Sequence, residues 1–172
     1  MATVAITPDQ NTVSGEIFIA APPARVFEAL TDPAQVPRWW GAQDMYRITK
    51  WKADLRIGGE WSSSGVGADG KEFSVGGEYL EIDPPHLLVH TWLYRWGGAN
   101  KTVVRFELEP KSVHALHPAG PQRAGTGTLL RITHEGFAPD AVAAADHSEG
   151  WKRVMGWLVA FVEKGETIET RH

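Results

Sequence analysis

The chain has 172 residues, of which 42% are hydrophobic and 22% charged, and its formal net charge is −4. This length and composition predict a single globular domain that is large enough to bury an apolar core. Because the net charge is negative and Lys and Arg form no cluster, we expect neither a nucleic-acid partner nor a polybasic membrane anchor. The chain contains no cysteine, which excludes disulfides, thiolate metal sites and cysteine nucleophiles.

The N-terminal sequence MATVAITPDQ does not have the basic segment and apolar run of a signal peptide. No stretch reaches the ~18 apolar residues of a membrane span. We therefore expect a cytoplasmic protein without membrane insertion. The eight tryptophans are the unusual feature of the composition. Each indole offers on the order of 200 Å² of surface that favours burial, so we expect several of them to line a core or a cavity.

The first structural elements are predicted in the order strand, helix, helix. VSGEIFIA at 13–20 is rich in β-branched and aromatic residues, which predicts a strand. PPARVFEALTD at 22–32 begins with prolines that suit a first helical turn and continues with apolar residues at helical spacing. PAQVPRWWG at 33–41 predicts a second, shorter helix. Adjacent helical residues cannot both face inward, so we expect one of Trp39 and Trp40 at a cavity entrance and the other packed beneath it.

The rest of the chain predicts strands followed by one long helix. From 45 to 135, apolar residues alternate with polar ones in segments that are separated by Gly, Pro and Asp clusters. This pattern predicts an antiparallel sheet of about six or seven strands. A helix over 140–164 would reach ~37 Å and could cross the whole sheet. Helical spacing leaves Trp157 outside one inward stripe, whose members are His147, Trp151, Val154, Met155, Leu158 and Val162. The predicted class is α+β.

Three motifs that resemble catalytic or binding signatures lack the context that such sites need. GVGADG at 65–70 fits G-x-G-x-x-G, but a strand follows it, so we predict a hairpin turn and no nucleotide site. His114 and His117 lie in a loop rich in Pro and Gly without a third ligand nearby, so we predict no metal site. The serines at 62–64 lie along a strand without an evident histidine partner. We therefore predict no cofactor and assign no catalytic residue.

Four phrases occur in a characteristic order: APPARVFEALTDPAQVPRWWG, ADLRIGGEW, GGEYLEIDPPHLLVHTW, and LRITHEGFAPD followed by DHSEGWKRVMGWLVAFVE. Together they resemble the heat-shock-protein ATPase activator homologue family of the START-like, birch-pollen-allergen-like superfamily. The resemblance implies a helix-grip fold, in which a curved antiparallel sheet wraps around a long C-terminal helix and encloses a cavity. We expect one domain over 1–172 with its core at 13–164 and flexible termini at 1–12 and 165–172.

Members of this family share a fold but differ in ligand, so the function must be argued from the cavity. Our leading hypothesis is the binding of a small hydrophobic molecule, such as an aromatic polyketide-like ring or a lipid-like metabolite. The ligand-binding residues that we expect are Trp40, Trp61, Tyr79, His90, Trp92, Tyr94, Phe106, His134, His147, Trp151, Met155 and Leu158.

Two alternative functions stay open at this stage. The first is a cyclase-, aromatase- or hydrolase-like enzyme in which a cavity His or Tyr moves a proton; the same histidines could instead be satisfied by backbone carbonyl groups. The second is a co-chaperone-like interaction module. The family's co-chaperone activity belongs to larger proteins that carry a separate N-terminal domain, so we do not expect a chaperone partner. Exposed tryptophans such as Trp96 or Trp157 would also permit a homodimer.

Overall fold

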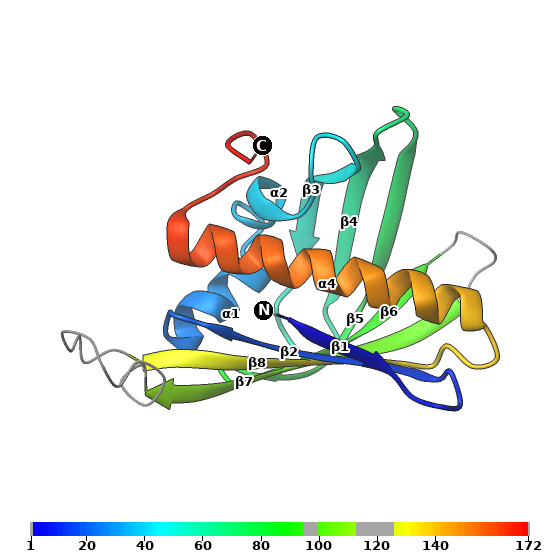
Figure 1. Ribbon diagram of the computed structural model, residues 1–172, viewed down its shortest axis with the longest axis horizontal. Helices are drawn as coiled ribbons and strands as arrows, with labels where there is room; N and C mark the ends of the chain where they lie inside the picture. The colour runs from blue at the N-terminus through cyan, green and yellow to red at the C-terminus, as the bar shows by residue number, and fades with distance from the viewer. Residues whose placement is uncertain (1, 95–99, 113–125, 172) are drawn as a thin grey trace.

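The computed structural model describes residues 2–94, 100–112 and 126–171, and its strands form one antiparallel sheet (Figure 1). The order of the eight strands is β1-β2-β8-β7-β6-β5-β4-β3. The strands are β1 (Thr3–Ile6), β2 (Thr12–Ile19), β3 (Tyr46–Ala53), β4 (Glu60–Gly67), β5 (Glu72–Asp83), β6 (Leu87–Tyr94), β7 (Asn100–Ser112) and β8 (Thr126–Glu135). The helices are α1 (Pro23–Thr31), α2 (Val36–Trp39) and α4 (Ala141–Lys164).

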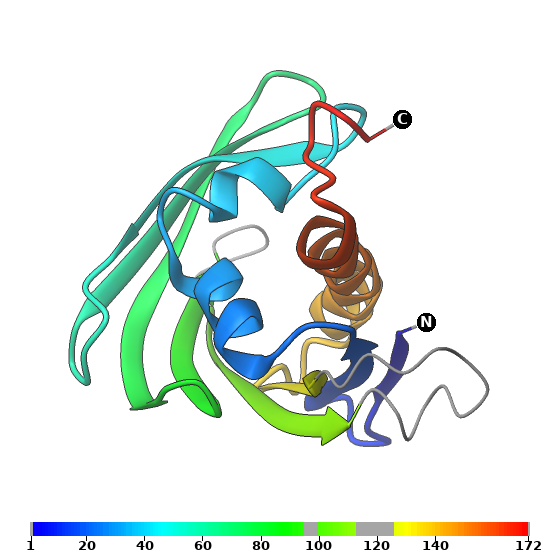
Figure 2. The ribbon, with the colours of Figure 1, turned by 90° about the vertical axis from the view of Figure 1, so that its left-hand side faces the viewer.

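The sheet curves around α4, as Figure 2 shows in a view nearly along that helix. Helix α4 packs on β1 and β2, while α1 and α2 contact it near its C-terminal end. The strands β3 to β5 form the opposite wall of the curved sheet and rise away from the helix (Figure 1). This architecture confirms the predicted α+β class and the helix-grip fold.

The curvature has local causes in two strands. The pairing register shifts between Tyr79 and Glu81 on β5 and between Ile48 and Lys50 on β3. Such a bulge bends a strand and increases its twist. At Gly77 of β5 an added Cβ would lie 2.0 Å from the Thr91 carbonyl oxygen of β6. Only glycine therefore lets the two strands approach this closely beside the bend.

The sheet has more strands than the six or seven that we expect from the sequence, because residues near the N-terminus form β1. Thr3 to Ile6 pair with β2 in an antiparallel register, although the sequence predicts a flexible segment there. The glycine motif at 65–70 forms the β4–β5 hairpin, as predicted, with Gly70 at φ +82° and its N–H donating to the Gly67 carbonyl.

Helix α1 begins with proline and ends before Asp32, as its sequence indicates. The first amides of a helix have no intrahelical acceptor, so proline costs no hydrogen bond there. Helix α2 is a single turn that is fixed to α1 by Trp39, whose Nε1 donates to the Ala29 carbonyl at 2.9 Å. Trp39 is fully buried, and Trp40 follows it at the C-cap of α2.

Helix α4 buries the predicted stripe from His147 to Leu158, while Val162 is half-buried. Trp157 is also buried, which corrects the expectation that it is available to a dimer interface. Its ring meets the Tyr46 ring edge-on at 5.8 Å, and the Arg171 guanidinium lies over it at 5.5 Å. Arg171 donates to the Gly41 and Trp39 carbonyls. The C-terminal segment, which we expect from sequence to be flexible, therefore covers this tryptophan.

The N-terminus of α4 provides a first prediction. The Asp140 carboxylate accepts from the Ala143 N–H at 2.9 Å, which satisfies one of the orphan amides of the first turn. We expect Asp140→Ala to lower the free energy of unfolding by about 1 kcal/mol, as measured by urea denaturation. Asp140→Asn, which keeps the acceptor, is the control and should stay within a few tenths of a kcal/mol of the parent protein; equal losses in both variants would contradict the capping role.

Candidate functional site

A cavity of about 380 Å³ lies between α4 and the strands β3, β4, β5 and β6. It forms on this side because α4 packs directly on β1 and β2, whereas the strands β3 to β5 rise away from the helix. The cavity wall is mainly aromatic. Its aromatic members are Trp40, Tyr46, Trp51, Phe73, Trp92 and Trp151.

The Trp40 ring stacks on the Trp51 and Trp92 rings of this wall, whereas the Trp151 ring is tilted against Trp40 and Trp92. The Trp40 ring lies 5.8 Å from the Trp51 ring and 6.2 Å from the Trp92 ring, with interplanar angles of 27° and 22°. Trp61, in the layer behind, stacks on Trp51 at 4.9 Å. Offset aromatic pairs at such distances contribute roughly 0.5–1.5 kcal/mol each beyond area burial. These contacts therefore hold the Trp40 ring within 27° of parallel to the Trp51 and Trp92 rings.

Strand alternation explains which side chains face inward. On β6 the buried residues Leu88, His90 and Trp92 are two apart, as side chains on one face of a strand must be. On β4 the same period buries Trp61 and Ser63. Trp51, Trp61 and Trp92 come from three different strands, so contacts across strands bring their rings together.

His134 lies behind the cavity and is hydrogen bonded at both ring nitrogens. Trp151 Nε1 donates to His134 Nδ1 at 3.0 Å, so the proton of the neutral ring is on Nε2. Nε2 then donates to Thr102 Oγ1 at 2.6 Å, and that hydroxyl donates to the Trp92 carbonyl oxygen at 2.9 Å. Burial, together with the neighbouring His147 and His90, holds the pKa of His134 well below its usual value. His134 is therefore a neutral structural link between α4 and the sheet.

His90 is buried within a ring of aromatic side chains and does not reach the cavity wall. Its Nδ1–H donates to the Thr91 carbonyl at 2.9 Å, and the Trp61 ring lies 4.8 Å away. Burial lowers the pKa of His90 to about 4, although the backbone hydrogen bond opposes the shift. The imidazole is consequently neutral at pH 7.

His147 is the histidine that lines the cavity among the described residues. Its Nδ1–H donates to the Ala143 carbonyl one turn earlier in α4 at 2.8 Å. Burial lowers the pKa of His147, while this hydrogen bond and the Asp146 and Asp140 carboxylates act in the opposite direction. A neutral imidazole thus forms part of the wall.

The indole N–H groups of two tryptophans that line the cavity differ from the others. Trp51 Nε1 and Trp92 Nε1 are buried and have no hydrogen-bond partner among the described residues. By contrast, Trp61 Nε1 donates to the Thr91 carbonyl at 3.1 Å, and Trp151 Nε1 is bonded to His134. A buried donor without an acceptor is costly and calls for an explanation.

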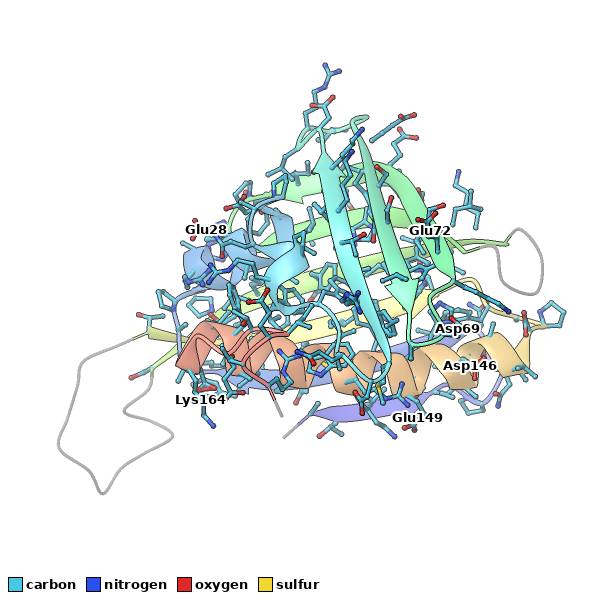
Figure 3. All side chains as sticks on the ribbon, turned by 90° about the horizontal axis from the view of Figure 1, so that it is seen from above. Glu28, Asp69, Glu72, Asp146, Glu149 and Lys164 are labelled. Carbon is cyan, nitrogen blue, oxygen red and sulfur yellow. The ribbon has the colours of Figure 1, made fainter. Side chains whose placement is uncertain are left out.

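Charged side chains lie at the cavity mouth. Asp146 and Arg153 of α4 line it. Figure 3 shows Asp69 and Glu72 of the β4–β5 hairpin on the same side of the molecule as Asp146, and Gly67 of this hairpin lines the cavity together with Asp146. Tyr46 is also part of the wall, where burial raises the pKa of its phenol despite the Trp40 indole and the Arg153 charge.

Some of the ligand-binding residues predicted from the sequence come together in the cavity wall, and others do not. Those that line it are Trp40, Trp92, His147 and Trp151. The others are buried in the core behind it: Trp61, Tyr79, His90, Phe106, His134, Met155 and Leu158. Tyr94 contributes its backbone to β6, and its side chain lies outside the described residues, as do Trp96, His114 and His117.

Several residues of the wall are missing from the sequence prediction. They are Tyr46, Ile48, Trp51, Ser63, Gly67, Phe73, Val75, Asp146, Gly150, Arg153 and Val154. The alternation in β3 already indicates that Trp51 is buried. It does not indicate that β3 faces a cavity instead of the helix, because that depends on how far the sheet bends.

A sequence profile of the family described as Activator of Hsp90 ATPase homolog 1-like protein matches residues 20–116. This match spans more than half of the chain. The chain belongs to this family. The resemblance carried by the four phrases is thereby confirmed. The matched residues of this AHSA1-like protein include the cavity residues Trp40, Trp51 and Trp92. Helix α4 lies C-terminal to the matched region.

Solved structures share the START-like fold of this AHSA1-like chain. A protein from Rhodobacter sphaeroides is 24% identical, with a TM-score of 0.73 over 95% of this chain and 99% of that one. A Chromobacterium violaceum protein is 27% identical, with a TM-score of 0.68 over 89% and 98%. An AHSA1-like protein from Aeromonas hydrophila is 20% identical, with a TM-score of 0.67 over 94% and 96%. Among curated proteins, none matches the chain.

Two kinds of feature are absent from the described residues. None of their helices is long and apolar enough to cross a membrane. They also contain no group of three or more His, Asp or Glu side chains placed to hold a metal ion.

Proposed function

We propose that this protein binds a flat hydrophobic or aromatic small molecule in the cavity between α4 and the β3 to β6 wall. The observation that carries this proposal is the stacked indole wall around about 380 Å³ of space. Ligand pockets of roughly 300–1,000 Å³ with mainly apolar walls are typical of small-molecule sites. A volume near the lower end of this range suits about two or three fused rings better than a long acyl chain.

The polar groups near the cavity support binding more than turnover. His134 uses both ring nitrogens in protein hydrogen bonds, and His90 is buried behind the wall. A cyclase-, aromatase- or hydrolase-like reaction would therefore have to use His147 or Tyr46, both of which line the cavity. General acid or base catalysis needs a group whose pKa lies near the working pH, whereas burial moves the pKa of His147 down and that of Tyr46 up.

The described outer face of the sheet gives less support to a protein-interaction module. Arg131 pairs there with Glu16 and Glu109, and Arg105 pairs with Glu81 and Glu107. These side chains are exposed ion pairs that water already solvates, each worth about 0–1 kcal/mol. An apolar surface patch, which marks many protein interfaces, is not what these strands present.

Two glycines of α4 allow a matched test of the proposal. Gly150 lines the cavity and Gly156 is exposed, and at both positions an added Cβ meets nothing within 4 Å. Gly150→Phe should fill cavity space and weaken binding of an aromatic probe such as 9-fluorenone by at least about tenfold, as measured by calorimetric titration. Gly156→Phe should bind like the parent protein. Both replacements remove a glycine from a helix interior, so neither is expected to reduce stability.

Two outcomes of this binding experiment would contradict the proposal. If the Gly150→Phe and Gly156→Phe variants bind the probe with equal affinity, the ligand occupies another surface. If the parent protein binds no aromatic probe at all, the cavity is a packing defect and not a binding site.

A further inference from the structure

We infer that Arg171 is a positioning residue of the proposed site: its guanidinium group holds the backbone on both sides of Trp40, so that the Trp40 ring stays in the cavity wall. This inference rests on the proposed function, because it concerns the same cavity. The C-terminal segment at 165–171 runs from the end of α4 back along α2 (Figure 1). Helix α2 ends at Trp39, and Trp40 follows it in the cavity lining.

The C-terminal segment binds three backbone carbonyl groups at and just after the end of α2. Arg171 Nη1 donates to the Gly41 carbonyl oxygen at 2.5 Å, and Nη2 donates to the Trp39 carbonyl oxygen at 3.4 Å. The Ile168 N–H donates to the Arg38 carbonyl oxygen at 2.8 Å, and the Ile168 side chain is buried. A guanidinium group is a planar fork of donors, so one arginine can bind two carbonyl groups that flank a single residue.

Arg171 also contacts α4, the helix that encloses the cavity together with the strands. Its guanidinium carbon lies 5.5 Å from the centre of the Trp157 ring, a distance typical of a cation–π contact. Trp157 is buried, and its ring meets the Tyr46 ring edge-on at 5.8 Å. The side chain of Arg171 therefore connects α4 to the backbone that carries Trp40.

Holding the guanidinium group at this place has a cost in stability. Arg171 Nε is buried and has no hydrogen-bond partner in the part of the chain that the structure describes. Burial lowers the pKa of Arg171, an effect that the Glu166 charge opposes. A desolvated charge often stabilises a fold less than a packed apolar side chain of similar volume. What the arginine provides is a defined geometry for the two carbonyl groups beside Trp40.

The backbone at Trp40 needs this constraint because a glycine follows it. Gly41 has φ +137°, and glycine can adopt many other backbone conformations as readily. On the side of β3, the Trp40 carbonyl accepts from the Ile48 N–H at 3.0 Å, and Trp40 Nε1 makes a long 3.4 Å contact with the Tyr46 hydroxyl. Without the Arg171 contacts, the Trp40 ring would occupy its place in the wall for only part of the time.

A ligand that stacks on Trp40 binds only the population in which this ring is in place. Its apparent dissociation constant is the intrinsic constant divided by that population. If release of the two carbonyl groups reduces the population to roughly a tenth, the affinity falls about tenfold. Arg171 would then control ligand affinity although it does not line the cavity.

Arg171→Met tests this inference on the full chain, because methionine retains an unbranched apolar side chain and removes the donors. We expect 9-fluorenone to bind this variant about tenfold more weakly in calorimetric titrations. In ¹H–¹⁵N spectra of the ligand-free variant, the Trp40 indole N–H signal should move or broaden. The Trp61 signal should change much less, because its N–H donates to the Thr91 carbonyl in the layer behind the wall.

Ile19→Val is the control for a simple loss of stability. Ile19 is fully buried in β2 and is not part of the cavity lining, so removing one of its methylene groups lowers stability without touching the backbone at Trp40. This variant should bind 9-fluorenone like the parent protein. Arg171→Lys keeps the charge but replaces the fork by a single ammonium group, so its affinity should lie between those of Arg171→Met and the parent protein.

The outcomes that overturn the inference differ from those that overturn the proposed function. If Arg171→Met binds 9-fluorenone with the parental affinity, Arg171 does not position the site, and the proposed function stands. If Arg171→Met and Ile19→Val weaken binding equally, the effect comes from stability and the inference is wrong. If Arg171→Met does not fold, Arg171→Lys decides, since parental affinity in that variant also contradicts the role of the fork. If the parent protein binds no aromatic probe, the proposed function and the inference fail together.

Discussion

The free energy of unfolding should fall steeply as the pH is lowered from 6.5, the usual pKa of histidine, to about 4, the pKa of His90 in the folded protein. In this window the unfolded chain takes up a proton that the folded protein does not, so each such histidine lowers stability by up to about 1.4 kcal/mol per pH unit. His90 alone would then remove roughly 3 kcal/mol across the window. His134 and His147, whose pKa values burial also lowers, add to the loss.

The sign of this effect follows from the direction of the shifts. Above pH 6.5 the histidines are neutral in both states and do not change stability; below about 4, His90 is protonated in both and its contribution becomes constant. Urea denaturation at a series of pH values measures the slope. His90→Phe should reduce it within the window. A stability that does not change between pH 6.5 and 4 would show that the buried imidazoles are protonated in the folded protein.

The second large effect is expected at Thr102, which connects His134 to the Trp92 carbonyl. Thr102→Val keeps the shape of the side chain but leaves His134 Nε2–H and the carbonyl without their partner. We expect a loss of about 1–3 kcal/mol in the free energy of unfolding, together with a changed environment of the Trp151 indole. Urea denaturation and the Trp151 indole N–H resonance measure the two effects.

Thr49→Val is the matched control for this replacement. Thr49 is an exposed strand residue whose hydroxyl makes only a long 3.3 Å contact with the Ser64 carbonyl, so its loss should stay within about 0.5 kcal/mol. Equal effects of the two replacements would mean that the chain of hydrogen bonds through His134 contributes nothing to the fold.

Local patterns in the sequence are sufficient to predict most elements of this fold. The 3.6-residue spacing from His147 to Leu158 predicts the buried stripe of α4, and the prolines at 22 and 23 predict where α1 begins. What the sequence does not predict depends on distant parts of the chain. Trp157 lies outside the stripe, and it is covered by Tyr46 and by the folded C-terminal segment with Arg171.

The candidate site is harder to predict than the fold for a physical reason. Alternation shows that Trp51, Trp61 and Trp92 face inward, but it cannot show which of them meet α4 and which meet empty space. That distinction depends on the bends of β3 and β5, which move the β3 to β6 wall away from the helix. The link from Trp151 through His134 joins residues that are 17 positions apart, so no local pattern reveals it.

The location of a bound probe is the most direct test of the central claim that this cavity is the ligand site. The methyl groups of Ile48, Val75 and Val154 line the cavity, whereas those of Leu130 are buried elsewhere in the core and those of Val142 are exposed. In a methyl-labelled sample, intermolecular nuclear Overhauser effects from 9-fluorenone should reach the first three residues and neither of the last two. Contacts to Val142 without contacts to Ile48, Val75 or Val154 would contradict the claim.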